Sequence, residues 1–180
     1  MTHIKSLFFA ISFLFIFISC GTDRSASEDV TAEAPQEAKN IILLIGDGMG
    51  VSQVSTAIYF REEPSNFLRF THTGLINTSS TSHKITDSAA GGTAFSAGTR
   101  TYNGAIGVGP DTASVENIVE IVSGKGYQTG VISTSSITHA TPAAFYAHTR
   151  SRGMQEEIAA QLVRSEVDVF LGGGTKFFED

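Results

Sequence analysis

The sequence has 180 residues, enough for one ordinary domain, and its 41% hydrophobic and 17% charged residues are typical of a globular protein rather than a disordered or fibrous one. A formal net charge of −6, with no cluster of lysine and arginine, excludes the basic stripe that binds the backbone of a nucleic acid. The charge does not exclude a small phosphorylated substrate, provided that metal ions supply positive charge.

Residues 1–19 are predicted to be a secretory signal peptide. Lys5 precedes an apolar run from Leu7 to Ile18, which is shorter than the ~20 residues that span a bilayer. The run ends in FISCG, which resembles the site where a bacterial lipoprotein is cleaved and acylated, although Phe17 stands where leucine is usual. We therefore expect a lipid anchor on Cys20, the only cysteine, and an extracytoplasmic location in the cell envelope. An ordinary signal peptide cleaved a few residues downstream is the alternative.

Residues 20–39 are expected to form a disordered tether. The segment from Gly21 to Lys39 contains five acidic residues, one arginine and one proline, and it has little that could be buried. The folded domain is expected to occupy residues 40–180.

Beyond the tether, apolar runs of strand length alternate with segments of helical spacing. Strands are predicted at 40–46, 74–80, 128–134 and 167–171, and helices at 52–60, 87–97, 114–123 and 154–165. The alternation predicts an α/β fold with a largely parallel central sheet flanked by helices. In such sheets, sites lie beyond the carboxyl ends of the strands.

Asp47 follows the first predicted strand, within the sequence GDGMG. Val51 occupies the third glycine position of a dinucleotide-binding fingerprint, and the lysine of a P-loop is absent. A carboxylate would repel a phosphate here, but it is well suited to a hard cation or to zinc. The alternative is that Asp47 is only a turn residue between flexible glycines.

Ser88 lies in the sequence ITDSAAGGT, residues 85–93. Asp87 is a good N-cap, so Ser88 would begin a helix where free backbone N–H groups favour an anion such as phosphate. Ser88 lacks the flanking glycines of a nucleophile elbow and has no obvious histidine base nearby. Either a coordinated metal activates the hydroxyl, or Ser88 is a plain capping residue.

The segment ITDSAAGGT resembles the signature of alkaline phosphatases: an aliphatic residue, any residue, Asp, Ser, four small residues and Thr. The segments KNIILLIGDGMG, TYNGAIGV, THATPAA followed by AH, and LGGGTKFF are similar to family segments in the same order, so the resemblance covers residues 39–180. It implies hydrolysis of phosphate monoesters through a phosphoserine, at a site with two zinc ions and one magnesium ion. Ser88 would be the nucleophile and a metal ligand, and Asp47 would bridge a zinc and the magnesium.

The resemblance implies further site residues. Thr141 matches a magnesium-binding threonine, and Arg152 has the spacing of the arginine that holds the substrate phosphate, with Arg150 as the rival. His139 stands where one branch of the family has aspartate, which favours zinc or water-mediated magnesium as the third metal. Residues 102–107 (YNGAIG) are expected to form a packing loop near the site.

Two zinc ions need about three or four protein ligands each, and the family draws most of them from chain that would follow Asp180. We therefore expect residues 1–180 to be the amino-terminal part of a longer phosphatase and to be inactive alone. Two other hypotheses are a metal-free serine hydrolase and a non-catalytic surface lipoprotein that binds phosphate or a partner. The preferred ester, any diesterase activity and the formation of a homodimer are left open by the sequence.

Overall fold

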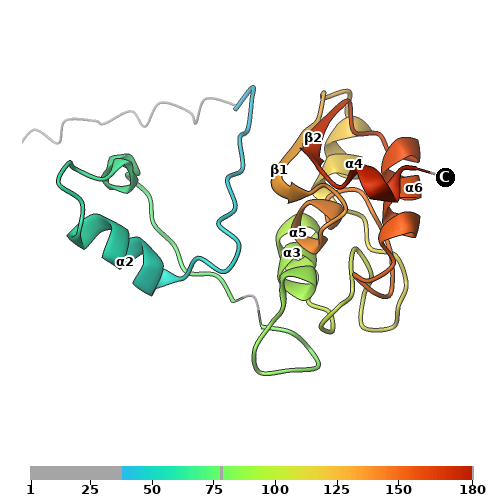
Figure 1. Ribbon diagram of the computed structural model, residues 1–180, viewed down its shortest axis with the longest axis horizontal. Coiled ribbons are helices and arrows are strands. Elements are labelled where there is room, and N and C mark those ends of the chain that lie inside the picture. The colour runs from blue at the N-terminus through green and yellow to red at the C-terminus, as the bar shows by residue number, and fades with distance from the viewer. Residues whose placement is uncertain (1–37, 78, 180) are drawn as a thin grey trace, which may run out of the picture. The chain divides into compact units, whose positions relative to one another are not determined.

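The computed structural model describes residues 38–77 and 79–179 of the chain (Figure 1). The predicted signal peptide, the predicted lipidation site at Cys20 and most of the predicted tether lie outside the described residues. The chain divides between Leu44 and Ile45 into two units, and every described residue of the first unit is exposed. Across the described residues, no helix combines the length and the apolar character needed to cross a bilayer.

Helices make up most of the regular structure in the second unit. The described α-helices are α2 (Val51–Tyr59), α3 (Ser88–Ala97), α4 (Ile118–Ser123), α5 (Ala140–Ala143) and α6 (Gln155–Arg164), and the short 3-10 helices are η1 (Asn66–Arg69) and η2 (Thr175–Phe177). The predicted helices at 52–60, 87–97 and 154–165 are confirmed to within one residue at each end. The short helix α5 was not predicted.

Helix α4 is shorter than the predicted segment 114–123. Asn117 is its N-cap, and the side-chain oxygen accepts hydrogen bonds from Val119 N (2.9 Å) and Glu120 N (3.2 Å). The Glu120 carboxylate accepts a bond from Asn117 N in return, which completes a capping box. Because this cap begins the helix at Ile118, the preceding residues 114–116 are not helical.

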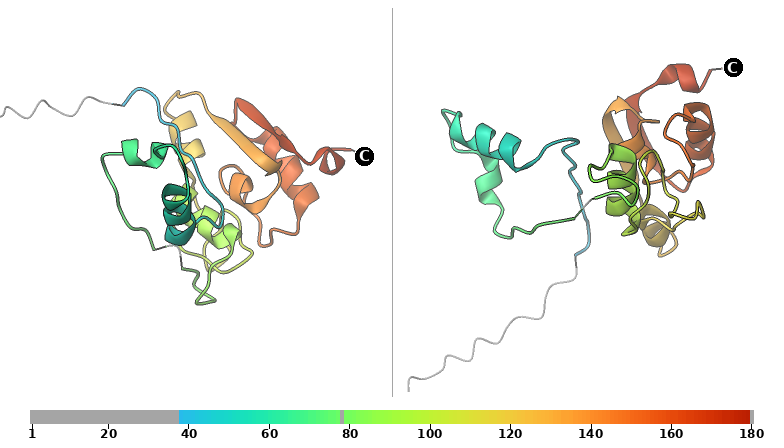
Figure 2. Two further views of the ribbon diagram at one scale, coloured as in Figure 1. Left: turned by 60° about the vertical axis from the view of Figure 1, so that its left-hand side comes forward. Right: turned by 90° about the horizontal axis from the view of Figure 1, so that it is seen from below.

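The strands of the described residues are β1 (Gly130–Ser136) and β2 (Val169–Gly173), which pair in parallel (Figure 2). In this pairing Val131 lies opposite Phe170. Each begins two residues later than predicted, at residue 130 instead of 128 and at 169 instead of 167. The α/β class is thus supported, but the sheet of the described residues has two strands rather than a large central array.

The predicted strands at 40–46 and 74–80 are wrong for the described residues, which are irregular at 40–46, 74–77 and 79–80. A strand exists only where a second strand takes up its backbone hydrogen bonds. An apolar run therefore indicates a preference for burial, and it does not specify a partner.

The core lies among α3, α5, α6, β1 and the loops between them. Ile158 and Leu162, one turn apart on α6, are both almost fully buried. Helix α3 packs against α5, and a side-chain carbon added at Gly92 would lie only 3.1 Å from Ala144 Cβ. The small residues of α3 thus let its backbone approach the segment that carries Thr141 (Figure 1).

Candidate functional site

The first part of the site is the N-terminus of α3. Asp87 is the N-cap, and its Oδ1 accepts a hydrogen bond from Ala90 N at 3.0 Å. Gly98 ends the helix in the left-handed conformation, with φ of 63°. The predicted cap and the predicted end are therefore both confirmed, and Ser88 is the first residue of the helix.

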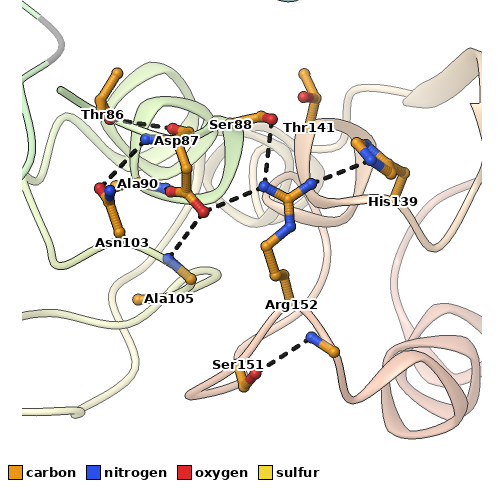
Figure 3. Close-up of polar contacts among 12 residues, drawn as sticks. Thr86, Asp87, Ser88, Ala90, Asn103, Ala105, His139, Thr141, Ser151 and Arg152 are labelled. Carbon is orange, nitrogen blue, oxygen red and sulfur yellow. Dashed lines mark hydrogen bonds and ion pairs between the residues drawn. The ribbon is translucent and has the colours of Figure 1, made fainter.

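Arg152 lies across this helix start (Figure 3). Its Nη1 donates to Asp87 Oδ2 at 3.1 Å and to Ser88 Oγ at 3.4 Å. Its Nη2 lies 3.1 Å from His139 Nε2, which must accept because a guanidinium only donates. The side chain of Arg152 is half-buried, whereas Arg150 is exposed. The fold thus brings together Asp87, Ser88 and His139 around Arg152, which contacts all three.

Opposing effects act on the pKa of the Asp87 carboxyl group. Burial acts to raise its pKa, but hydrogen bonds from Ala90 N, Gly104 N and Arg152, together with the positive charge of Arg152, outweigh burial and hold the pKa below the ordinary value of 3.8. Asp87 is therefore an anion at neutral pH, and it orients the arginine.

The second part of the site joins Asp47 to α5. Thr141 Oγ1 donates a hydrogen bond to Asp47 Oδ2 at 2.9 Å, although the two residues are 94 positions apart in sequence. His139, the N-cap of α5, precedes Thr141 by two residues, so one short helix carries the neighbours of both Asp47 and Arg152. The fold therefore assembles the predicted residues into two bonded groups that meet at α5.

The donor set fits a hard cation in part. Asp47 and Thr141 bring two oxygen atoms together, and oxygen ligands are those that magnesium prefers. Among residues 38–77 and 79–179, however, no three His, Cys, Asp or Glu side chains gather into a metal-binding group. These residues therefore offer part of a magnesium shell, and they do not offer a zinc-binding set.

The loop expected only to pack near the site is bonded to it directly. Gly104 N donates to Asp87 Oδ2 at 3.0 Å, and Asn103 Oδ1 accepts from Asp87 N at 3.2 Å. These contacts were missed because they join residues that are 16 or 17 positions apart. The only signal in the sequence was the place of YNGAIG among the segments that resemble the family.

His148 lies outside this set of contacts. Its Nδ1 is 2.7 Å from the Gly107 carbonyl oxygen, and its Nε2 is 2.8 Å from a carboxylate oxygen of Glu120. The ring thus connects α4 to the loop that contains Gly107, which is a structural role.

The geometry defines a class of site: a serine at a helix N-terminus, beside an arginine held by a carboxylate, is an arrangement suited to an oxyanion. A protein-family model described as "Alkaline phosphatase" matches residues 38–180. The chain belongs to the alkaline phosphatase family.

Similar proteins include alkaline phosphatase 3 of Bacillus subtilis, 37% identical over 187 residues, which cover 93% of this chain and 40% of that protein. The alkaline phosphatase of Escherichia coli is 36% identical over 189 residues, covering 89% of this chain and 40% of that protein. The chain therefore spans about 40% of the length of these curated relatives.

Solved structures are also similar. The alkaline phosphatase from the Antarctic bacterium TAB5 has a TM-score of 0.71 and 52% identity, over 73% of this chain and 39% of that one. Two further structures of that enzyme are variants in which a histidine is replaced by glutamate or aspartate, with magnesium bound in the M3 site.

Proposed function

We propose that the protein hydrolyses phosphate monoesters through a phosphoserine formed on Ser88. The observation that carries this proposal is the contact of Arg152 with both Asp87 and Ser88 at the start of α3. A phosphate that approaches Ser88 Oγ would meet the free N–H groups of the helix start and the two N–H edges of the guanidinium. Family membership and the relatives named alkaline phosphatase support the same reaction class.

The reaction assigns a task to each residue. Arg152 binds two phosphate oxygens and holds the phosphorus in line with Ser88 Oγ. Attack by Ser88 Oγ forms the Oγ–P bond and breaks the ester P–O bond, and the serine proton goes to the departing alcohol. Water then attacks the phosphorus and breaks the Oγ–P bond. One proton of the water restores the Ser88 hydroxyl, and inorganic phosphate leaves. Asp87 keeps the guanidinium oriented through both steps.

Metal ions, when bound, would supply the positive charge that lets a serine hydroxyl lose its proton. Asp47 and Thr141 would hold part of a magnesium shell. His139 would tune that site. In the relative from TAB5, variants with a histidine replaced by glutamate or aspartate have magnesium bound in the M3 site. No task is assigned to zinc, because the described residues do not gather a set of ligands for it.

The alternative of a metal-free serine hydrolase lacks a base. The hydrogen-bond partner of Ser88 Oγ within the described structure is Arg152 Nη1, which can only donate. A lipoprotein that binds phosphate without turnover remains the second candidate, favoured by the absence of a complete metal-binding group among the described residues.

Trapping of the covalent intermediate tests the function. The protein expressed from its complete gene is mixed with a labelled aryl phosphate and quenched in acid. We expect label on the unmodified protein and on Ser96→Ala, a control about two turns further along α3. We expect none on Ser88→Ala or after treatment with a chelator. Label retained by Ser88→Ala would refute the assignment of the nucleophile.

We also propose that Cys20 is lipidated and anchors the mature protein to a membrane, facing an extracytoplasmic compartment. The sequence FISCG supports this proposal, and a cysteine that carries two or more acyl chains anchors stably where one chain is marginal. Cys20→Ser should move the protein to the soluble fraction of a cell lysate. Membrane retention of that variant would indicate an uncleaved helix.

A further inference from the structure

We infer that Asn103 is a positioning residue, because the turn that contains it sets the placement of Ser88 relative to Arg152. The inference rests on the proposed function, since it concerns the alignment of the nucleophile with the phosphate-binding arginine. The turn comprises residues 102–105, and it was expected only to pack near the site.

The Asn103 side chain forms two hydrogen bonds to the backbone just before Ser88. Its side-chain oxygen accepts from Asp87 N at 3.2 Å (Figure 3). Its side-chain nitrogen donates to the Ile85 carbonyl oxygen at 3.1 Å. One amide group therefore satisfies a donor and an acceptor on either side of Thr86, much as a neighbouring strand would. The chain that leads into Ser88 has its path fixed by these two bonds.

The same turn is hydrogen-bonded to the loop that carries Arg152. The Gly104 carbonyl oxygen accepts from Arg152 N at 2.7 Å, and the Tyr102 hydroxyl donates to the Arg150 carbonyl oxygen at 3.1 Å. Gly104 N also donates to Asp87 Oδ2, so Gly104 contacts both halves of the site. The turn is therefore a bracket between two segments that are 64 residues apart in sequence.

The bracket has a defined shape. Ala105 N donates to the Tyr102 carbonyl oxygen at 3.2 Å, and Gly104 has φ of +89°, the conformation that the third residue of a type II turn requires. A residue with a side chain would be strained at that position. The bonds from the turn to Asp87 and to Arg152 are thus held at a fixed spacing.

This spacing matters for the proposed reaction because the serine oxygen must be aligned with a phosphate held by Arg152. An error of about 1 Å in such an alignment can cost roughly 100-fold in rate. Replacement of Asn103 by alanine removes both bonds to the segment 85–87, while the carbonyl of Gly104 still anchors Arg152. The change should therefore disturb the nucleophile more than the binding of phosphate.

A kinetic comparison separates positioning from general stabilisation. In the protein expressed from its complete gene, Asn103→Ala should lower kcat/KM for an aryl phosphate about 10- to 100-fold. The value is expressed per active site, with the active sites counted by the acid-quench trapping described above. The inhibition constant of inorganic phosphate should change much less. Asn103→Asp keeps the acceptor for Asp87 N and should recover part of the loss. Asn77→Ala removes a side-chain amide oxygen that accepts a similar hydrogen bond from Ser79 N, and it should have no effect.

Two kinetic outcomes would overturn the inference. An unchanged kcat/KM per active site would show that Asn103 contributes only to folding. A proportional loss of kcat/KM and phosphate affinity would show that the turn acts on the arginine rather than on the nucleophile.

Hydrogen exchange provides a readout that does not depend on turnover. The backbone amides of residues 85–90 should exchange faster in Asn103→Ala than in the unmodified protein or in Asn77→Ala, as measured by mass spectrometry. If the unmodified protein hydrolyses no phosphate ester, the proposed function fails while this measurement still reports on the bracket. Unchanged exchange in Asn103→Ala would refute the inference whether or not the protein is active.

Discussion

Helices α2 and α3 are similar in length but differ in what surrounds them. Helix α2 has no buried residue, and Val51 at its start is 76% exposed. Helix α3 buries six residues, including Ala89, Gly92 and Thr93. A local pattern is therefore sufficient to form a helix, whereas burial depends on residues far away in the sequence.

The same contrast divides the candidate site. Ser88 and Arg152 belong to the buried region, where caps, a turn and a charged carboxylate hold them. Asp47 is exposed and belongs to the region of α2, with Thr141 as its partner. The half of the site that we propose binds an oxyanion, here called the oxyanion-binding half, is thus built largely by the described residues. The half that we propose binds metal, here called the metal-binding half, is only partly built by them.

The largest expected effect concerns the metal-binding half. Residues 20–180 alone should give no phosphatase activity above background, even with added zinc and magnesium, because the described residues hold too few metal donors. Poor solubility is also expected, because large apolar side chains such as Leu75 are exposed. The activity of residues 20–180 is measured with an aryl phosphate, with and without a chelator. Robust chelator-sensitive hydrolysis would mean that the metal-binding half is as complete as the oxyanion-binding half.

The next effect concerns the arginine. In the protein expressed from its complete gene, Arg152→Ala should lower kcat/KM about 10²- to 10³-fold, the usual cost of removing a donor to a developing oxyanion. Arg150→Ala is the matched control, since the Arg150 side chain is exposed, and it should have little effect. Steady-state kinetics of the two variants show which arginine binds the substrate phosphate. A larger loss of kcat/KM for Arg150→Ala would assign that role to Arg150.

A smaller change is expected at the metal-binding half. His139→Asp should raise the affinity for magnesium relative to zinc by about 10-fold, because it replaces an imidazole by a hard anionic ligand near Asp47 and Thr141. Titration of metal-free protein by calorimetry measures the shift, with the exposed His83→Asp as control. Equal magnesium affinity in both variants would mean that His139 does not approach the metal.

The smallest effect is a change in stability with pH. Asp87→Ala should cost about 1 kcal/mol as a lost N-cap, whereas asparagine can cap the helix but carries no charge for Arg152. The pKa of Asp87 is lowered in the folded state, so its charge stabilises the fold fully above the ordinary pKa of 3.8, and this contribution is lost as the pH falls through the lowered value. Thermal unfolding of Asp87→Asn should therefore approach that of the unmodified protein in acid. A constant difference at all pH values would contradict this.

Features encoded by neighbouring residues could be predicted from the sequence. The Asp87 cap, the glycine that ends α3 and the pair Ile158 and Leu162 all depend on spacings within a few residues. The strand expected at 40–46 could not be predicted correctly, because a strand depends on a partner that its own sequence does not specify.

The candidate site shows the same limit. The resemblance to the family selected Ser88 and Arg152, which the fold brings within 3.4 Å between Ser88 Oγ and Arg152 Nη1. It did not select Asn103, because a single amide that bonds to a distant backbone leaves no period, cap or charge pattern in the sequence.

The contact between Arg152 and His139 couples the two halves of the site, because a single lone pair of His139 can serve only one of them at a time. His139 Nε2 has one lone pair, and it is used to accept from Arg152 Nη2. That nitrogen can therefore bind the guanidinium or a metal, but not both. A phosphate that draws Arg152 away frees the nitrogen, so phosphate binding should favour metal binding through Nε2, and by thermodynamic reciprocity the metal should favour phosphate to the same degree.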